Sequence, residues 1–289
     1  MKMTAKFHLP GLRYNYPLNM MLLSLKEKYP HYFQDNIEIA SFFGEFPTSL
    51  WNGGRFSNGD QCDRRFVEEV VKSINTRGIP VRYTYTNPLL TEEDLADAYC
   101  NFCMKTADNG KNEVLVVSPI LEAYIRKNYP GFTINSSTCK EIRGIEGVNE
   151  ELKKDYGLVV LDYNLNNQFG ELQKITDKSR CELLVNACCI PECPRRGEHY
   201  RTIAKQQRIT LKNRRHPADK QIPVPGWHCE YGNCNTIYDI QEYKTFISAE
   251  DIWEKYLPMG FCNFKIEGRT ADYFNLIDTY CYYLMEPKY

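Results

Sequence analysis

The residues of this sequence best suited to chemistry are two close pairs of cysteines. Cys189 and Cys193 enclose three residues in the segment CIPEC, and Cys229 and Cys234 enclose four residues in CEYGNC. Two such pairs can converge on one four-coordinate site, where sulfur ligands suit either zinc or the irons of an iron–sulfur cluster. The spacing does not choose between these cofactors, and it leaves open a third interpretation in which the thiols are buried packing residues.

The residues around the first pair distinguish its cysteines from their neighbour. Pro191 and Pro194 fix their own φ angles and lack a backbone donor, which favours a turn over the start of a helix around Cys193. Cys188 and Cys189 are neighbours in a strand-like run, so their side chains should point to opposite faces of the strand. We therefore expect Cys188 to pack against the barrel wall and not to bind metal. Two further cysteines are the alternative ligands: Cys62 and Cys262.

The ending KIEGR is a second group that could do chemistry. In strand alternation Glu267 and Arg269 point the same way, and Gly268 between them lets a ligand approach the backbone. An arginine beside a carboxylate can bind an anionic substrate, and the glutamate can act as acid or base if burial raises its pKa. The alternative is a structural ion pair. His199, shortly after Cys193, is a candidate proton donor or substrate ligand, or else a surface histidine.

Three other polar residues are candidate substrate ligands. Arg55 follows two glycines in NGGR, a setting that suits a phosphate or carboxylate group. Asn87 and Asn186 come at the ends of the apolar runs VRYTYTN and CELLVN. The alternative for each asparagine is a polar residue that ends a strand because the following loop is in water.

The elements that must position these residues alternate between strand-like and helical patterns. The strand-like runs are KFHLPGL, IEIASFFGEF, VRYTYTN, EVLVVSP, FTINSST, YGLVVLDYN, CELLVNACC and FCNFKIEGR. The segments between them have apolar residues three and four apart, as helices do. Alternating units imply parallel strands joined by crossovers, and eight of them favour a single (β/α)8 TIM-type barrel over residues 1–289. The carboxyl ends of its strands are where barrel enzymes place their chemistry.

The segment from 195 to 241 interrupts this alternation. It is basic in its first half, contains prolines in its middle and has no clean helical period, so we expect a long, cysteine-bearing loop at the barrel rim after the seventh strand. Its run KNRRH can contact phosphate, although such a charge run is more often a solvated face.

Composition narrows the class of protein but names no partner. A chain of 289 residues with 43% hydrophobic and 25% charged residues and a net charge of -1 is typical of a globular protein without general attraction to nucleic acid or anionic membrane. The N-terminus lacks the apolar core of a signal peptide, and no window is apolar enough to span a membrane, so we expect a cytoplasmic protein. Its 12 cysteines are then kept reduced, which favours metal binding over disulfides.

Several segments resemble one known family, the U-thirty-two (collagenase-like) peptidase superfamily. LLVNACCIPECPRRGEHY resembles its strand-then-cysteine segment, and FISAEDIWEKYLPMGFCNFKIEGR resembles its closing motif. NGGRFS, VVSPILEAYIRKNYPGFTINSS and LDYNLNN are further matches, so the resemblance covers nearly the whole predicted barrel.

The resemblance implies a barrel that carries a [4Fe–4S] cluster on four cysteines. Cys189 and Cys193 match the paired cysteines of the family, and Cys229 and Cys234 lie where later ligands occur. In one relative a ligand comes from the loop after the second strand, which would correspond to Cys62 here. Relatives take part in oxygen-independent hydroxylation of ubiquinone precursors or of RNA bases, and some work as heterodimers, so a homologous partner subunit and an electron donor are implied.

Three functions remain to be compared. The first is a cluster-containing hydroxylase or related redox enzyme acting on a small aromatic or nucleobase substrate. The second is a non-catalytic module in which a metal holds the long loop and the rim binds RNA or protein. The third is a peptidase, for which the sequence has neither a Gly-x-Ser-x-Gly nor a His-Glu-x-x-His motif.

Overall fold

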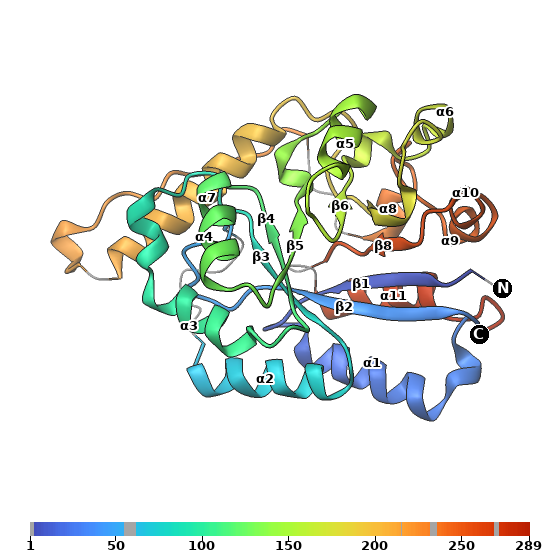
Figure 1. Ribbon diagram of the computed structural model, residues 1–289, viewed down its shortest axis with the longest axis horizontal. Helices are drawn as coiled ribbons and strands as arrows, with labels where there is room; N and C mark the ends of the chain where they lie inside the picture. The colour runs from blue at the N-terminus through green and yellow to red at the C-terminus, as the bar shows by residue number, and fades with distance from the viewer. Residues whose placement is uncertain (1–2, 55–61, 215, 232–235, 269–271) are drawn as a thin grey trace.

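The computed structural model describes residues 3–54, 62–214, 216–231, 236–268 and 272–289. Its centre is a closed barrel of parallel strands in the order β1 to β8, which confirms the predicted (β/α)8 fold (Figure 1). The strands are β1 (Ala5–Pro10), β2 (Ile37–Gly44), β3 (Val81–Tyr85), β4 (Glu113–Val116), β5 (Thr133–Ser136), β6 (Val159–Val160), β7 (Cys181–Leu184) and β8 (Asn263–Lys265). Pairing of β8 with β1 closes the ring.

Helices connect and surround the strands. The longer ones are α1 (Tyr16–Lys28), α2 (Arg64–Thr76), α3 (Ala98–Ala107), α4 (Pro119–Asn128), α5 (Ile145–Leu152), α7 (Arg196–Asn213) and α11 (Tyr273–Leu284). The shorter ones are α6 (Phe169–Leu172), α8 (Ile237–Ile240), α9 (Ala249–Asp251) and α10 (Leu257–Met259). Aspartates begin several of them, because a carboxylate can accept from a free N–H group of the first turn: Asp63 at α2, Asp97 at α3 and Asp272 at α11. No helix within the described ranges is long and apolar enough to cross a membrane.

Strand alternation separates an apolar core from a polar barrel interior. Leu183 of β7 packs outward in the main hydrophobic core, together with Phe7 and Phe264. Glu182, next to Leu183, faces the barrel axis, where it meets charged side chains of other strands. Side chains on a strand point alternately to its two faces, so a single strand supplies both regions.

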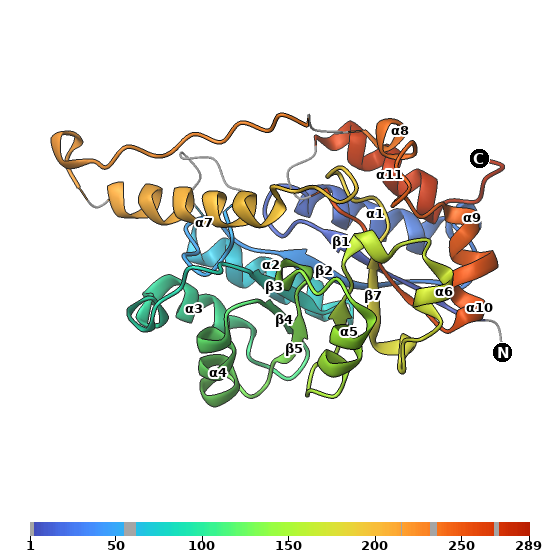
Figure 2. The same ribbon diagram turned by 90° about the horizontal axis from the view of Figure 1, so that it is seen from above.

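The segment from 195 to 241 differs from the predicted loop in its first half. Residues Arg196–Asn213 form α7, which Figure 2 shows extending sideways beyond the barrel, while the chain after it runs back alongside. Asn213 holds this return segment through a pair of hydrogen bonds with the backbone of Ile222. The helix has few apolar residues to bury, which is why apolar periodicity did not reveal it, and polar side chains attach it to the barrel loops instead.

These attachments lay α7 across the mouth of the barrel. Gln207 donates to the carbonyl of Ser49 in the loop after β2, and Arg208 forms a 3.0 Å ion pair with Asp94 after β3. A Cβ atom on Gly54 would lie 2.5 Å from the carbonyl oxygen of Ile203, so this loop and α7 touch through their backbones. The helix therefore roofs part of the space above the carboxyl ends of the strands.

Candidate functional site at the barrel mouth

A cavity of about 660 Å³ opens at the carboxyl ends of the strands, beneath α7. Its floor includes side chains of the strands themselves, such as Phe43, Leu115, Leu184 and Lys265. Its walls and roof include the segment after β7, the first turns of α7 and the return segment. This is the place where the fold predicts a binding site, because loops from several strands meet here.

Five cysteines among the described residues line this cavity: Cys139, Cys188, Cys189, Cys193 and Cys229. Burial raises the pKa of the Cys189 thiol to about 11, while a hydrogen bond with Tyr163 acts to lower it and the neighbouring Cys193 acts to raise it. Cys189 and Cys193 are thus in direct contact. Cys229 reaches the same cavity from the return segment after α7, so the fold brings together thiols that are far apart in sequence.

Cys188 packs against the main hydrophobic core, as predicted, but it also reaches the cavity. Cys188 lines the cavity, and its N–H group donates a 3.1 Å hydrogen bond to Glu267 Oε2. The reason is that β7 ends at Leu184, so strand alternation does not extend to the cysteines.

The four cysteines predicted as ligands fit a sulfur-bound cofactor in their chemistry, and three of them share one cavity. Cys234 lies outside the described residues. Among the residues that the structure does describe, no three His, Cys, Asp or Glu side chains are grouped closely enough to hold one metal ion. Binding through Cys189, Cys193 and Cys229 would therefore require the return segment to bring Cys229 closer to the other two.

The two alternative ligands lie elsewhere. Cys262 precedes β8 at the opposite end of the barrel, with its sulfur 3.7 Å from the carbonyl oxygen of Ser179. Cys62 precedes α2 and contacts Tyr99 of α3, and burial raises its pKa. Neither is part of the cavity lining.

Arg196 fixes the start of α7 on the cavity wall. Its guanidinium group is buried, forms a 2.8 Å ion pair with Asp162 after β6, and donates to the carbonyl and hydroxyl oxygens of Thr138 after β5. The same group lies 4.3 Å from the ring centroid of Tyr163 and hydrogen-bonds the hydroxyl of Tyr200. A paired, stacked arginine of this kind holds several loops in one arrangement.

His199 belongs to an aromatic group on the same wall. Its ring stacks on Trp227 with the planes 4° apart and the centroids 4.8 Å apart, and the guanidinium carbon of Arg195 lies 4.4 Å from the Trp227 ring centroid. All three side chains line the cavity. The predicted site residue His199 is therefore placed beside the cysteines, with flat rings next to it.

Glu267 also reaches the cavity, at the end of the chain segment that follows β8. Its backbone is clamped by Asn186, which accepts from the Glu267 N–H at 2.7 Å and donates to the Glu267 carbonyl at 3.1 Å. Asn186 is itself buried, so its amide joins the ends of β7 and β8 and orients Glu267. Arg269, predicted to act with Glu267, lies outside the described residues.

Asn87, another predicted substrate ligand, is not brought to the cavity. Asn87 is fully buried, donates to the carbonyl of Leu50 and accepts from the N–H of Leu89, so its amide joins the loops after β2 and β3. Arg55 lies outside the described residues.

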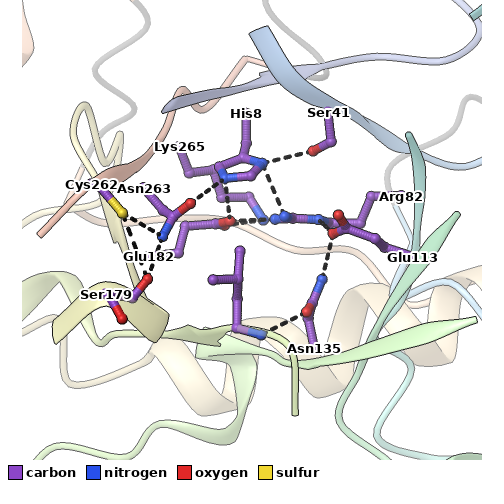
Figure 3. Close-up of polar contacts among 11 residues, drawn as sticks. His8, Ser41, Arg82, Glu113, Asn135, Ser179, Glu182, Cys262, Asn263 and Lys265 are labelled. Atoms are coloured by element: carbon purple, nitrogen blue, oxygen red, sulfur yellow. Dashed lines mark hydrogen bonds and ion pairs between the residues drawn. The ribbon is translucent and has the colours of Figure 1, made fainter. Parts of the chain in front are cut away.

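Beneath the cavity floor lies a buried network of charges that spans the barrel (Figure 3). Arg82 of β3 is fully buried; it donates to Glu182 of β7 and, at 2.6 Å, to Glu113 of β4. Lys265 of β8 lies 3.4 Å from the other oxygen of Glu182. Burial acts to raise the pKa of Glu182, but the charge of Arg82 first, and that of Lys265 with it, hold this pKa well below its usual range. Glu182 is therefore an ionised carboxylate between two cations.

His8 completes this network as a neutral imidazole. Its Nδ1 atom lies 2.9 Å from a nitrogen of Arg82, which can only donate, so Nδ1 must accept and the proton must sit on Nε2. Nε2 then faces Glu182 and Asn263, each at 3.4 Å. Burial and the nearby Arg82 guanidinium lower the pKa of His8 from 6.5 to about 4, in agreement with this assignment.

Sequence reasoning missed Arg82, Glu182, Lys265 and Arg196. A signal was present for the first two, because a charged residue in the middle of a short apolar strand must find a partner when the strand is buried. The sequence could not name the partner, since Arg82 and Glu182 are 100 residues apart.

Comparisons with known proteins support the fold of this chain but do not show its function. No family model and no curated protein matches the sequence. A solved structure described as that of the U32 peptidase Mk0906 is similar over 93% of this chain and 94% of that chain, with a TM-score of 0.51 and 14% sequence identity. At this identity the similarity shows a common barrel architecture. The class that fold and site define is thus a (β/α)8 barrel with a U32 peptidase-like fold and a cysteine-lined cavity at its mouth.

Proposed function

We propose that this chain is an iron–sulfur protein of the U-thirty-two peptidase superfamily that takes part in an oxygen-independent hydroxylation, or a related redox modification, of a small aromatic or nucleobase substrate. The cluster ligands are Cys189, Cys193, Cys229 and Cys234. An electron donor and a homologous partner subunit belong to the same proposal. When bound, a [4Fe–4S] cluster supplies one-electron transfer.

The observation that carries the proposal is the shared cavity of Cys189, Cys193 and Cys229. Two of these thiols follow β7 and the third comes from beyond α7, yet all face the same space. Thiols from separate segments seldom gather around a cavity for packing alone, because buried cysteines pack like other small apolar residues. The superfamily assignment rests on the motifs of the sequence together with the similar barrel.

The other residues of the cavity suit a flat substrate. Trp227, His199 and Tyr200 form a stack of flat rings on the wall, and a planar molecule can extend such a stack. Glu267, oriented by Asn186, points a carboxylate at the same space and can accept or return a proton there.

The test is metal and sulfide analysis of the full chain purified without oxygen. The proposal expects iron and acid-labile sulfide in equal amounts, about four of each per chain, with an absorption spectrum that bleaches on reduction. Zinc in place of iron, without sulfide, would contradict the redox function and leave a structural metal site.

Matched cysteine variants test the ligand assignment. Cys189→Ser and Cys193→Ser should each lose most of the iron and sulfide, and Cys229→Ser should do the same. Cys262→Ser is the control, since it makes the same exchange of sulfur for oxygen at the opposite end of the barrel. Equal iron loss in the control and the ligand variants would show that the assignment is wrong.

A peptidase is the second candidate, favoured by the similarity to the structure described as a U32 peptidase. The same anaerobic preparation, incubated with casein and with a mixed fluorogenic peptide library, tests it. Cleavage that disappears in Glu267→Gln would support peptidase function, whereas absence of cleavage from an iron-loaded preparation would leave the redox proposal as the better account.

A further inference from the structure

Lys265 is placed where it can hold an anionic substrate group. It is the last residue of β8, is only 6% exposed, and belongs to both the charge network and the cavity lining. We propose that Lys265 anchors the carboxylate of a small organic anion at the floor of the cavity, which sets the substrate class of the site. The inference rests on the proposed function only in taking this cavity as the substrate cavity.

The ammonium group of Lys265 lies between Glu182 and the ring of Phe43. Its Nζ atom is 3.4 Å from Glu182 Oε1, longer than an ammonium–carboxylate hydrogen bond, and 4.1 Å from the centroid of the Phe43 ring. Glu182 Oε1 accepts no hydrogen bond from any described group, whereas Oε2 is bound tightly by Arg82. The attraction between Lys265 and Glu182 is therefore one that a ligand carboxylate can compete with.

Charge balance explains why such competition is possible. Within the network the cations are Arg82 and Lys265, the carboxylates are Glu113 and Glu182, and His8 is neutral. The single side chain of Arg82 donates hydrogen bonds to both Glu113 and Glu182. Glu182 therefore keeps a strong partner when Lys265 turns to a ligand. An ionised group in a buried position interacts with an opposite charge more strongly than it would in water.

The rest of the floor indicates what the anion carries. The ring of Phe43 lies against the lysine, and Leu115 and Leu184 add apolar surface to the same cavity. The hydroxyl-bearing residues of the lining are Thr84, Thr86, Ser137, Thr138, Tyr163, Tyr200 and Tyr231. A carboxylate on an aromatic or short aliphatic body matches a buried positive charge that lies beside apolar side chains.

Binding of benzoate and acetate, each compared with its neutral amide, tests the inference. Calorimetry and ligand-observed NMR on the anaerobically purified full chain should show saturable binding of benzoate, with benzamide at least about tenfold weaker. Lys265→Met should reduce benzoate binding by at least about tenfold and leave benzamide unchanged. Lys255→Met, which removes a lysine paired with Asp251 on an outer helical turn, is the control and should change neither.

A second variant keeps the test informative if Lys265→Met folds poorly. Glu182→Gln removes the competing carboxylate while Arg82 still pairs with Glu113, so benzoate should bind more tightly than to the unchanged protein. Lys265→Met and Glu182→Gln thus act in opposite directions, and the double variant, which again balances the network charges, should bind benzoate no better than benzamide. A purely structural ion pair would give loss of stability in both single variants and no such opposition.

Three results would overturn the inference: equal binding of acids and amides, benzoate binding that survives Lys265→Met, or no saturable binding of either acid. These outcomes are independent of the metal analysis. A preparation without iron that still binds benzoate through Lys265 would refute the proposed redox function and keep the anion site, and the reverse result would refute the anion site alone.

Discussion

The buried imidazole of His8 makes the stability of the barrel depend on pH in a way that one substitution can isolate. His8 is 2% exposed and contacts Arg82, Ser41, Glu182 and Asn263 in the network beneath the cavity. Burial first, and the charge of Arg82 second, lower its pKa from 6.5 to about 4. The folded protein therefore resists protonation of this ring, while the unfolded chain accepts the proton near pH 6.5.

The sign and size of the effect follow from this difference in pKa. Because the folded-state pKa of His8 is the lower one, its contribution to stability is fully present above the unfolded pKa of 6.5 and is lost as pH falls toward about 4. Between pH 7 and pH 5 the loss from this one group amounts to about 2 kcal/mol. Glu182 stays ionised over this range, because its pKa lies well below its usual value.

The assay is urea unfolding at pH 7 and pH 5, followed by circular dichroism, for the unchanged protein and for His8→Gln. A glutamine can accept from Arg82 but does not titrate, so the free energy of unfolding should fall by about 2 kcal/mol less in the variant than in the unchanged protein. His31→Gln, at an exposed histidine, is the control and should keep the full pH dependence. An equal fall in His8→Gln and the unchanged protein would refute the assignment of a neutral, protected His8.

Three further predictions concern the charge network, the contact of α7 with the loop after β2, and the hydrogen bonds between Asn186 and Glu267. Arg82→Met leaves the buried Glu182 and the half-buried Glu113 without their main cation. It should lower the free energy of unfolding by about 3–5 kcal/mol at neutral pH, measured by urea unfolding; a loss below about 1 kcal/mol would contradict the network. Gly54→Ala adds a Cβ against the Ile203 carbonyl at a φ of +86°, so it should expose α7 to limited proteolysis, whereas Gly78→Ala, at a φ of +76° with open space around it, should not. Asn186→Ala removes both hydrogen bonds to the Glu267 backbone and should destabilise the protein by about 1–3 kcal/mol; a neutral result would show that this clamp is dispensable.

Much of the architecture was accessible from the sequence because it depends on local patterns. Eight apolar runs separated by helical spacing predicted the eight strands and their parallel order, which the closed barrel confirms. The exception was α7, whose residues attach to the loops through Gln207, Arg208 and Arg196 instead of an apolar stripe. Helix periodicity reports burial of apolar surface, so a helix held by polar contacts leaves no such signal.

The sequence by itself determined that this protein is a (β/α)8 barrel and that its thiols occur in close pairs after the seventh strand and beyond the following segment. Only the tertiary structure decided which side chains share a space: Cys188 joins the cavity because β7 ends at Leu184, and Cys262 is placed at the far end of the barrel. It also decided that Lys265 faces both the cavity and Glu182. The physical reason is that closure of the barrel brings distant strands together, and burial then makes every charge inside it depend on the partner it meets.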